Sequence, residues 1–222
     1  MYPLSEADLE EVYAAAAERD QRLADLLLID AWTGLRWSEL RAMRVRDFIE
    51  VPLPVLVVQR AAPEGVRVKV TKSGNSPRVP VADRVLPLLR VLASGRAADE
   101  LLFVTSSRHQ LHASAFKRTL AWARVARGRR IHDLRHAAAC LWLARGVDPV
   151  TVKTWMGHAS MSTTNLYLHH VGTSADRAGL ARLNERGEQG ANEAAIRRND
   201  KDRFRELFEG LPWSAATFCW WS

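Results

Sequence analysis

The sequence predicts an α+β fold that is mostly helical and carries one small antiparallel β-sheet. Apolar side chains recur at helical spacing near the N-terminus and again after residue 83. Between these two regions, short β-branched runs alternate with turn residues, as is typical of antiparallel strands. The 222 residues suit one domain with or without an appendage, because a domain averages roughly 150 residues.

The N-terminal region is expected to form two helices and then a short helical turn. Ser5, followed three residues later by Asp8, indicates a helix N-cap. A second helix is expected from about Asp20 to Trp32. Gly34 should end it, since glycine readily adopts the left-handed conformation found after helices. Residues 38–41 then begin a short helical turn.

The expected strands are three β-rich runs, Val55–Gln59, Val66–Thr71 and Arg78–Val81. Turn-forming residues at 63–65 separate the first two runs, and Ser73–Pro77 separates the last two. We therefore expect a small antiparallel sheet, with Lys72 at the tip of its second hairpin.

Helical patterns resume at Asp83. The candidate helices are Ser114–Val125, His132–Ala144, Val150–Met156 and Ser162–Leu168. Gly146 is expected to stop the second of these helices. Asp148 and Pro149 indicate the start of the third, because aspartate caps helices well and the first turn tolerates proline.

The chain is interpreted as one catalytic domain over residues 1–184, followed by a linker and tail over 185–222. The linker is polar, and the tail from Phe204 to Ser222 holds three of the eight tryptophans. The tail is consistent with a buried helix, a docking segment for a second copy, or a frame-shifted end.

Positive charge is concentrated in the middle of the chain. Residues 31–145 carry 21 basic and 8 acidic side chains, whereas residues 1–30 carry 2 and 8. A basic region suggests a polyanionic partner such as nucleic acid, although an Arg-rich solvated surface has the same composition.

Composition also excludes several classes of protein. Two cysteines cannot build a disulfide framework or a Cys-based zinc site. No apolar stretch approaches the ~20 residues of a membrane span, and no secretory signal follows Met1. The expected compartment is a reducing cytoplasm, with no membrane partner.

Two local patterns bring positive charge to helix starts. Arg36 and Glu39 lie one helical turn apart after a glycine, which fits either a surface ion pair or a positioned guanidinium. His132 and Arg135 lie three residues apart at a helix N-terminus, where the helix dipole also favours an anion. Each pattern alone is more often structural.

Three further side chains have ordinary explanations when each is taken alone. Lys72 at a hairpin tip commonly serves solubility, yet a loop can also deliver an ammonium to a phosphate. His158 follows Gly157, and Tyr167 lies nine residues later, where a tyrosine on a helix usually packs in the core.

In this order and at these separations, the patterns resemble the signature of the tyrosine recombinases, the integrase family of phages and mobile elements. That signature runs Thr-Gly-Leu-Arg-x-x-Glu-Leu, a hairpin lysine, His-x-Leu-Arg, Leu-Gly-His and then a tyrosine. The resemblance covers about Leu4 to His170, with Met156 in place of the usual leucine. It implies the catalytic domain of this family, without the N-terminal core-binding domain that members normally carry.

The resemblance implies site-specific cleavage and rejoining of DNA strands through a covalent 3′-phosphotyrosine. Tyr167 is then the nucleophile. Arg36 and Arg135 are the groups expected to hold the non-bridging phosphate oxygens, because a guanidinium forms two charge-assisted hydrogen bonds at once.

The other site residues take roles that the resemblance implies. His132 is expected to accept the tyrosine proton, and Lys72 to protonate the leaving 5′ oxygen. His158 is expected to donate a hydrogen bond to the phosphate, and Glu39 to orient the arginines.

The implied partner is double-stranded DNA, with a homotetramer acting on two duplexes in a bacterial host cell. No cofactor is expected, and no metal, because the sequence has no acidic cluster to hold Mg²⁺. Three alternatives stay open: a non-catalytic helix-turn-helix protein using Asp148–Met156 and Ser162–His169, a type IB topoisomerase, and a histidine metalloenzyme. The last is disfavoured because Asp133 stands where the His132/His136 pair would need glutamate.

Overall fold

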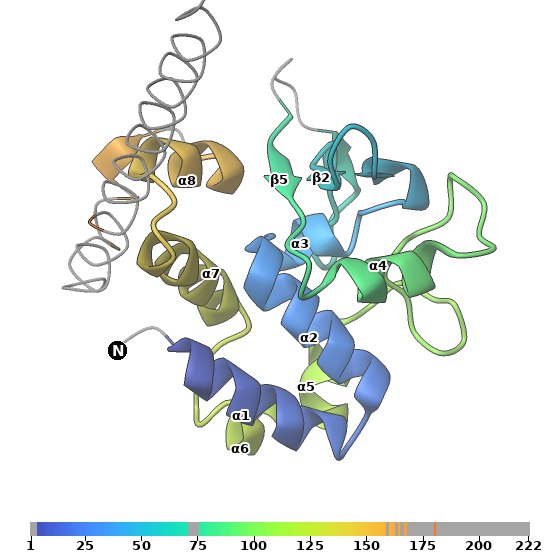
Figure 1. Ribbon diagram of the computed structural model, residues 1–222. Helices are drawn as coiled ribbons and strands as arrows, with labels where there is room; N and C mark the ends of the chain where they lie inside the picture. Colours follow the sequence, from blue (N-terminus) through green and yellow to red (C-terminus); the bar gives the residue numbers. More distant parts are fainter. Residues whose placement is uncertain are drawn as a thin grey trace, which may run out of the picture. The chain divides into compact units, whose positions relative to one another are not determined.

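The computed structural model describes residues 4–70, 76–158, 160–162, 164, 167 and 180 (Figure 1). All but Leu180 belong to a compact unit of residues 1–175. The mostly helical α+β class with a small antiparallel sheet is confirmed. The helices are α1 Glu6–Ala17, α2 Gln21–Thr33, α3 Trp37–Leu40, α4 Leu86–Ala93, α5 Ala113–Thr119, α6 Trp122–Val125, α7 His132–Ala144 and α8 Pro149–Met156, with a short 3₁₀ helix at Val45–Asp47.

The two N-terminal helices begin and end close to the expected residues. Ser5 caps α1, and its hydroxyl accepts from the Asp8 backbone N–H at 3.1 Å while Asp8 accepts from the Ser5 backbone at 2.9 Å. The Asp20 side chain caps α2 by accepting from the Leu23 backbone N–H at 2.9 Å. Gly34 ends α2 at φ +60°, in the left-handed region that glycine occupies without strain.

Helices α2 and α7 pack against each other and both contribute to the core (Figure 1). A Cβ atom at Gly34 would lie 3.0 Å from the Ala138 side chain and 3.2 Å from the Trp142 ring. The Trp142 indole also donates to the Trp32 carbonyl at 3.1 Å. The missing side chain therefore lets the end of α2 approach α7, which places the start of α3 beside that helix.

The sheet differs from the expected three-run meander. Strands β1 (Phe48–Ile49), β2 (Val55–Val57) and β5 (Arg78–Pro80) form one antiparallel sheet in the order β1-β2-β5. The run at 66–71 instead supplies β4 (Lys69–Val70), which pairs with β3 (Arg60–Ala61). The sequence interpretation missed β1 and β3 because two-residue strands show no alternation of apolar and polar side chains.

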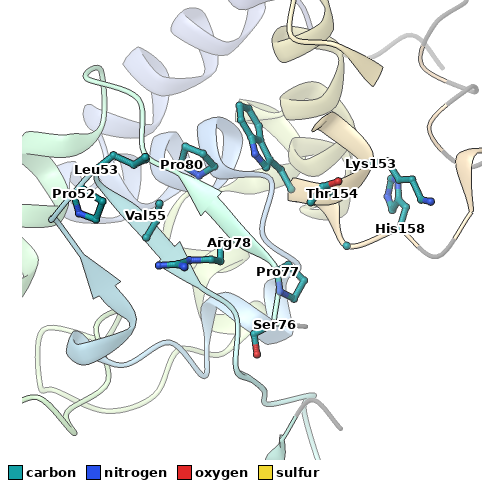
Figure 2. A pocket seen from close by; sticks show the side chains of 12 residues that line it. Pro52, Leu53, Val55, Ser76, Pro77, Arg78, Pro80, Lys153, Thr154 and His158 are labelled. Carbon is teal, nitrogen blue, oxygen red and sulfur yellow. The ribbon is translucent and has the colours of Figure 1, made fainter. Parts of the chain in front are cut away.

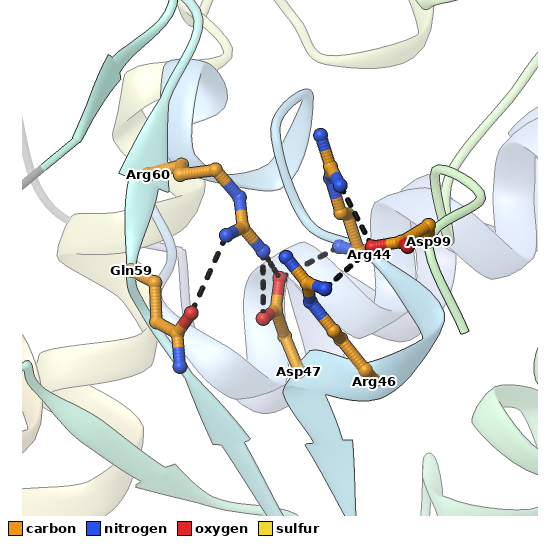
Figure 3. Close-up of polar contacts among 6 residues, drawn as sticks. All are labelled: Arg44, Arg46, Asp47, Gln59, Arg60 and Asp99. Atoms are coloured by element: carbon orange, nitrogen blue, oxygen red, sulfur yellow. Dashed lines mark hydrogen bonds and ion pairs between the residues drawn. The ribbon is translucent and has the colours of Figure 1, made fainter.

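A polar network joins β3 to the segment that precedes β1 (Figure 3). The Arg60 guanidinium donates to both carboxylate oxygens of Asp47, at 2.8 and 2.7 Å, and Asp47 is buried. Arg44 and Arg46 share the exposed carboxylate of Asp99. The buried pair fixes the base of the β3–β4 hairpin, from which the chain continues toward residue 72.

The expected helix Ser114–Val125 is wrong as a single element. It is divided into α5 and α6 at Ala121, which has φ +49°. Helix α7 matches its expected bounds, and Asp148 caps α8. Ser162, Thr164 and Tyr167 are helical, and the rest of Ser162–Leu168 lies outside the described residues.

The linker and Trp-rich tail at 185–222 also lie outside the described residues. Within the part that is described, none of the helices combines the length and apolar character needed to cross a lipid bilayer.

Candidate active site

The turn between α2 and α3 holds Arg36 and Glu39 together. Glu39 lies at the third position of α3, and its Oε2 accepts from the Arg36 backbone N–H at 2.8 Å. Its Oε1 accepts from Arg36 Nη1 at 2.6 Å. The Glu39 side chain is only 8% exposed, whereas that of Arg36 is 43% exposed. The carboxylate therefore anchors a guanidinium that still faces solvent.

Arg135 on α7 is buried, in contrast to the partly exposed Arg36. Its side chain is 5% exposed. Nη1 donates to the Gly34 carbonyl at 2.5 Å, and Nη2 donates to the Met156 carbonyl. Nη1 also lies 3.9 Å from Glu39 Oε2. One guanidinium thus joins the α2–α3 turn, α7 and the end of α8, and it brings both predicted arginines to one carboxylate.

Tyr167 lies between two histidine rings. Its hydroxyl is 2.8 Å from His136 Nδ1, and its ring stacks at 19° on the His158 ring with 6.2 Å between centroids. The side chain is buried, and burial raises the pKa of Tyr167, which the positive charge of Arg135 partly offsets. The hydroxyl is therefore protonated at neutral pH before any substrate binds.

His158 follows the left-handed Gly157 that ends α8. Its Nδ1 lies 3.1 Å from the Thr164 hydroxyl. Burial, followed by the charges of Arg135 and Arg36, lowers the pKa of His158 to about 4. The ring is thus neutral at neutral pH, and it can present one N–H to an anion.

The ring of His132, the expected proton acceptor, contacts the neighbouring histidine on α7. Its ring meets the His136 ring edge-on at 4.9 Å between centroids. Among the described residues, the partner of the tyrosine hydroxyl is His136, which sequence reasoning did not select. The His132/His136 spacing of four residues was the available signal, because it places both rings on one face of α7.

Lys72 lies outside the described residues, so the predicted hairpin-tip position is not described. The chain is described again at Ser76, and there it adjoins the site. A Cβ atom at Gly157 would lie 2.8 Å from Pro77 Cγ, so the start of β5 packs tightly against the end of α8. Ser76, Pro77 and His158 accordingly border the same cavity.

An open cavity of 710 Å³ lies between the sheet and the end of α8 (Figure 2). His158 and Lys153 border it on the α8 side, and Pro77 and Arg78 border it on the strand side. Two basic side chains at such a hollow favour an anionic occupant. Among the described residues, no three His, Cys, Asp or Glu side chains gather as ligands for a metal ion.

Comparison with known proteins identifies the family of this chain. The model of the phage integrase family matches residues 3–173. The tyrosine recombinase XerA of Saccharolobus solfataricus is 31% identical over 168 residues, which are 76% of this chain and 52% of that protein. The integrase of Mycobacterium phage FRAT1 is 32% identical over 164 residues, which are 68% of this chain and 49% of that protein. The chain thus spans about half the length of these relatives.

Solved structures agree on the fold. A Tn1549 transposon integrase in complex with circular intermediate DNA has a TM-score of 0.65 at 21% identity, covering 82% of this chain and 66% of that one. The crystal structure of XerA recombinase has a TM-score of 0.59 at 25% identity, covering 82% and 65%. The family match extends over most of the chain and includes Arg36, Arg135, His158 and Tyr167, so the chain belongs to the phage integrase family.

Proposed function

We propose that this chain carries the catalytic centre of a site-specific DNA recombinase, which cleaves and rejoins strands through a covalent 3′-phosphotyrosine. One observation carries the proposal. The buried Tyr167 contacts two histidines and lies near the buried Arg135. These side chains come from segments that are far apart in the chain. The similarity to recombinases and integrases supports the same reaction.

The two arginines suit a phosphodiester. Arg36 is half-exposed, so it can exchange part of its contact with Glu39 for a non-bridging oxygen. Arg135 keeps its positive charge beside the site while its carbonyl contacts fix it in place. When Tyr167 attacks phosphorus, a pentavalent transition state with extra negative charge forms. The positive charge of the two arginines is already in place to stabilise it.

His158 and Lys72 have separate roles, one in hydrogen bonding to the phosphate and the other in proton transfer. With the ring proton of His158 on Nε2, Nδ1 accepts from the Thr164 hydroxyl and the Nε2–H is available to a phosphate oxygen. We assign protonation of the leaving 5′ oxygen to Lys72. His132 contributes through its ring contact with His136 rather than by touching the hydroxyl. The phosphotyrosine conserves the bond energy, so rejoining needs no ATP.

Double-stranded DNA is the proposed substrate, and four copies on two duplexes are the proposed assembly, in the cytoplasm of a bacterial host. The basic middle of the chain, with 21 basic and 8 acidic side chains, supports contact with phosphates. We assign catalysis to residues 1–184 and treat 185–222 as a linker and tail.

The alternatives receive less support. A helix-turn-helix reader would expose its second helix to the DNA groove, whereas Tyr167 is 6% exposed and is held by His136. A type IB topoisomerase would share the chemistry, but the relatives described above are named as recombinases and integrases.

Trapping the covalent intermediate tests the proposal. The protein is incubated with a pool of randomised duplexes, each nicked so that the short strand bearing the 5′-hydroxyl diffuses away after cleavage. The expected result is a protein–DNA adduct stable in SDS, whose sequence also reveals the target. Tyr167→Phe should fold normally and form no adduct. An adduct formed by Tyr167→Phe at the wild-type rate would contradict the proposal.

A sulfur substitution tests Lys72. Lys72→Ala should slow cleavage of an ordinary duplex by about 10²-fold or more, the usual contribution of general acid catalysis. A 5′-bridging sulfur leaves without a proton, so that substrate should restore the rate of Lys72→Ala. Arg36→Ala is the control, and it should not be rescued because Arg36 acts on non-bridging oxygens. Equal rescue of both variants would remove Lys72 from this role.

A further inference from the structure

The hydroxyl of Tyr167 already has a hydrogen-bond partner before DNA binds. His136 Nδ1 lies 2.8 Å from Oη, and the two rings are tilted by 46° with 5.6 Å between centroids. His132 precedes His136 by one helical turn and, within the described part of the chain, makes no hydrogen bond to the tyrosine. The histidine that touches the reacting oxygen is therefore His136.

The protonation of both groups allows Tyr167 to donate this hydrogen bond. Burial lowers the pKa of His136 and raises the pKa of Tyr167, so both are neutral near pH 7. A neutral phenol has one proton to donate, and a neutral imidazole has one nitrogen to accept it. With the ring proton of His136 on Nε2, Tyr167 is the donor of this hydrogen bond and Nδ1 is the acceptor.

Burial favours an uncharged His136 ring at rest, and the charges around the ring act in both directions. The groups that face it are Arg130 before α7, His132, Asp133 and Arg135 on α7, His158 after α8, and Tyr167 itself. Arg130 and Arg135 oppose a positive ring, and Asp133 favours one. Asp133 also bonds to Arg130, at 2.8 Å to its backbone N–H and 3.3 Å to its guanidinium. A nearby carboxylate can stabilise the imidazolium once a proton arrives.

We propose that His136 holds the Tyr167 hydroxyl in place and accepts its proton during cleavage. The inference rests on the proposed function. As the bond from Oη to phosphorus forms, the proton moves from Oη to Nδ1, and the bond from phosphorus to the 5′ oxygen breaks. The 5′ oxygen takes a proton from the general acid, so no proton is gained or lost in total. Rejoining reverses each transfer.

Two substitutions separate proton transfer from positioning. His136→Asn retains an acceptor near the place of Nδ1 but cannot take a proton at neutral pH. His136→Phe keeps the ring volume and removes the acceptor. An exposed histidine, His109, supplies the matched control His109→Asn. Single-turnover adduct formation on the nicked duplexes is then measured for each protein from pH 5 to pH 9.

The expected results are specific to a proton acceptor. Wild type and His109→Asn should lose rate as the pH falls, because a protonated His136 cannot accept. Both His136 variants should be slower by about 10²-fold or more, and His136→Asn should lack the acid limb. If His136→Asn keeps the wild-type rate, or keeps the acid limb, the ring does not take the proton and the proposal is overturned.

A measurement without DNA keeps the two proposals distinguishable. ¹⁵N NMR of the DNA-free protein should show His136 with an unprotonated, hydrogen-bonded Nδ1 and a protonated Nε2, and Tyr167→Phe should shift the Nδ1 signal. A protonated Nδ1 at neutral pH would overturn the proposal even if His136→Phe failed to fold. If Tyr167→Phe still forms adduct, the proposed function fails, whatever the NMR of His136 shows.

Discussion

Arg36 and Arg135 lie near the same carboxylate, yet their surroundings differ. The Arg36 side chain is 43% exposed and bonds to Glu39 beside the α2–α3 turn. The Arg135 side chain is 5% exposed and bonds to two backbone carbonyls from separate segments. A solvent-facing arginine can exchange partners at little cost, whereas a buried one maintains the packing around it. Two arginines with one proposed chemical purpose therefore contribute unequally to stability.

The largest expected effect is on Arg135. Arg135→Ala leaves two carbonyls without donors and leaves the buried Glu39 carboxylate without this cation. Removing one partner of a buried pair typically costs about 3–5 kcal/mol. Arg36→Ala removes a half-exposed pair and should cost about 1 kcal/mol or less. Urea unfolding measures both, and adduct assays should show loss of cleavage in each. Equal losses of stability would remove the distinction between the two arginines.

A substitution of Gly34 tests how tightly the turn between α2 and α3 is packed. Gly34→Ala places a methyl group 3.0 Å from the Ala138 side chain and 3.1 Å from Met156 Cε at a left-handed φ. Overpacking should cost about 1–3 kcal/mol, in addition to the backbone strain. Gly95→Ala is the matched control, because Gly95 has φ +67° with open space around its Cα. A similar unfolding free energy for both variants would show that the turn has room for a side chain.

Asp30 gives the smallest expected effect. It is buried, and its Oδ1 has no hydrogen-bond partner among the described residues. Burial raises the pKa of Asp30 well above its usual value, and the charge of Arg135 opposes this rise. The folded protein thus holds this proton more firmly than the unfolded chain does, and this contribution to stability falls as the pH rises above about 4.

Asp30→Asn should remove that part of the pH dependence. The amide keeps the shape of the side chain and leaves both carbonyl contacts of Arg135 in place. Unfolding free energies measured from pH 4 to pH 8 should therefore decline less in the variant than in wild type. A steeper decline in the variant would mean that Asp30 is held as a carboxylate by Arg135.

Sequence patterns were informative where structure is local. The spacing of apolar residues gave α7 its observed bounds, and the three-residue separation of Arg36 and Glu39 predicted their contact. The break at Ala121 was missed because neither glycine nor proline marks it. The pairing of β3 with β4 was missed because those strands contain two residues each.

The candidate site shows the same limit. The resemblance to the tyrosine recombinase signature selected Arg135, His158 and Tyr167, which the structure brings near one another. The contact between His136 and Tyr167 depends on how the segment after α8 folds back onto α7, and no spacing within one helix encodes that. The burial that distinguishes Arg135 from Arg36 is likewise a tertiary property.

The close approach of Gly157 and Pro77 has an evolutionary consequence. A larger residue at position 157 would collide with the proline ring, because its Cβ would lie 2.8 Å from Pro77 Cγ. Substitutions at these two positions should therefore arise in pairs among homologues, as they do at contacting sites. A lineage that lost the proline would gain the freedom to replace the glycine, and asparagine, which tolerates the left-handed conformation, would be the first replacement to persist.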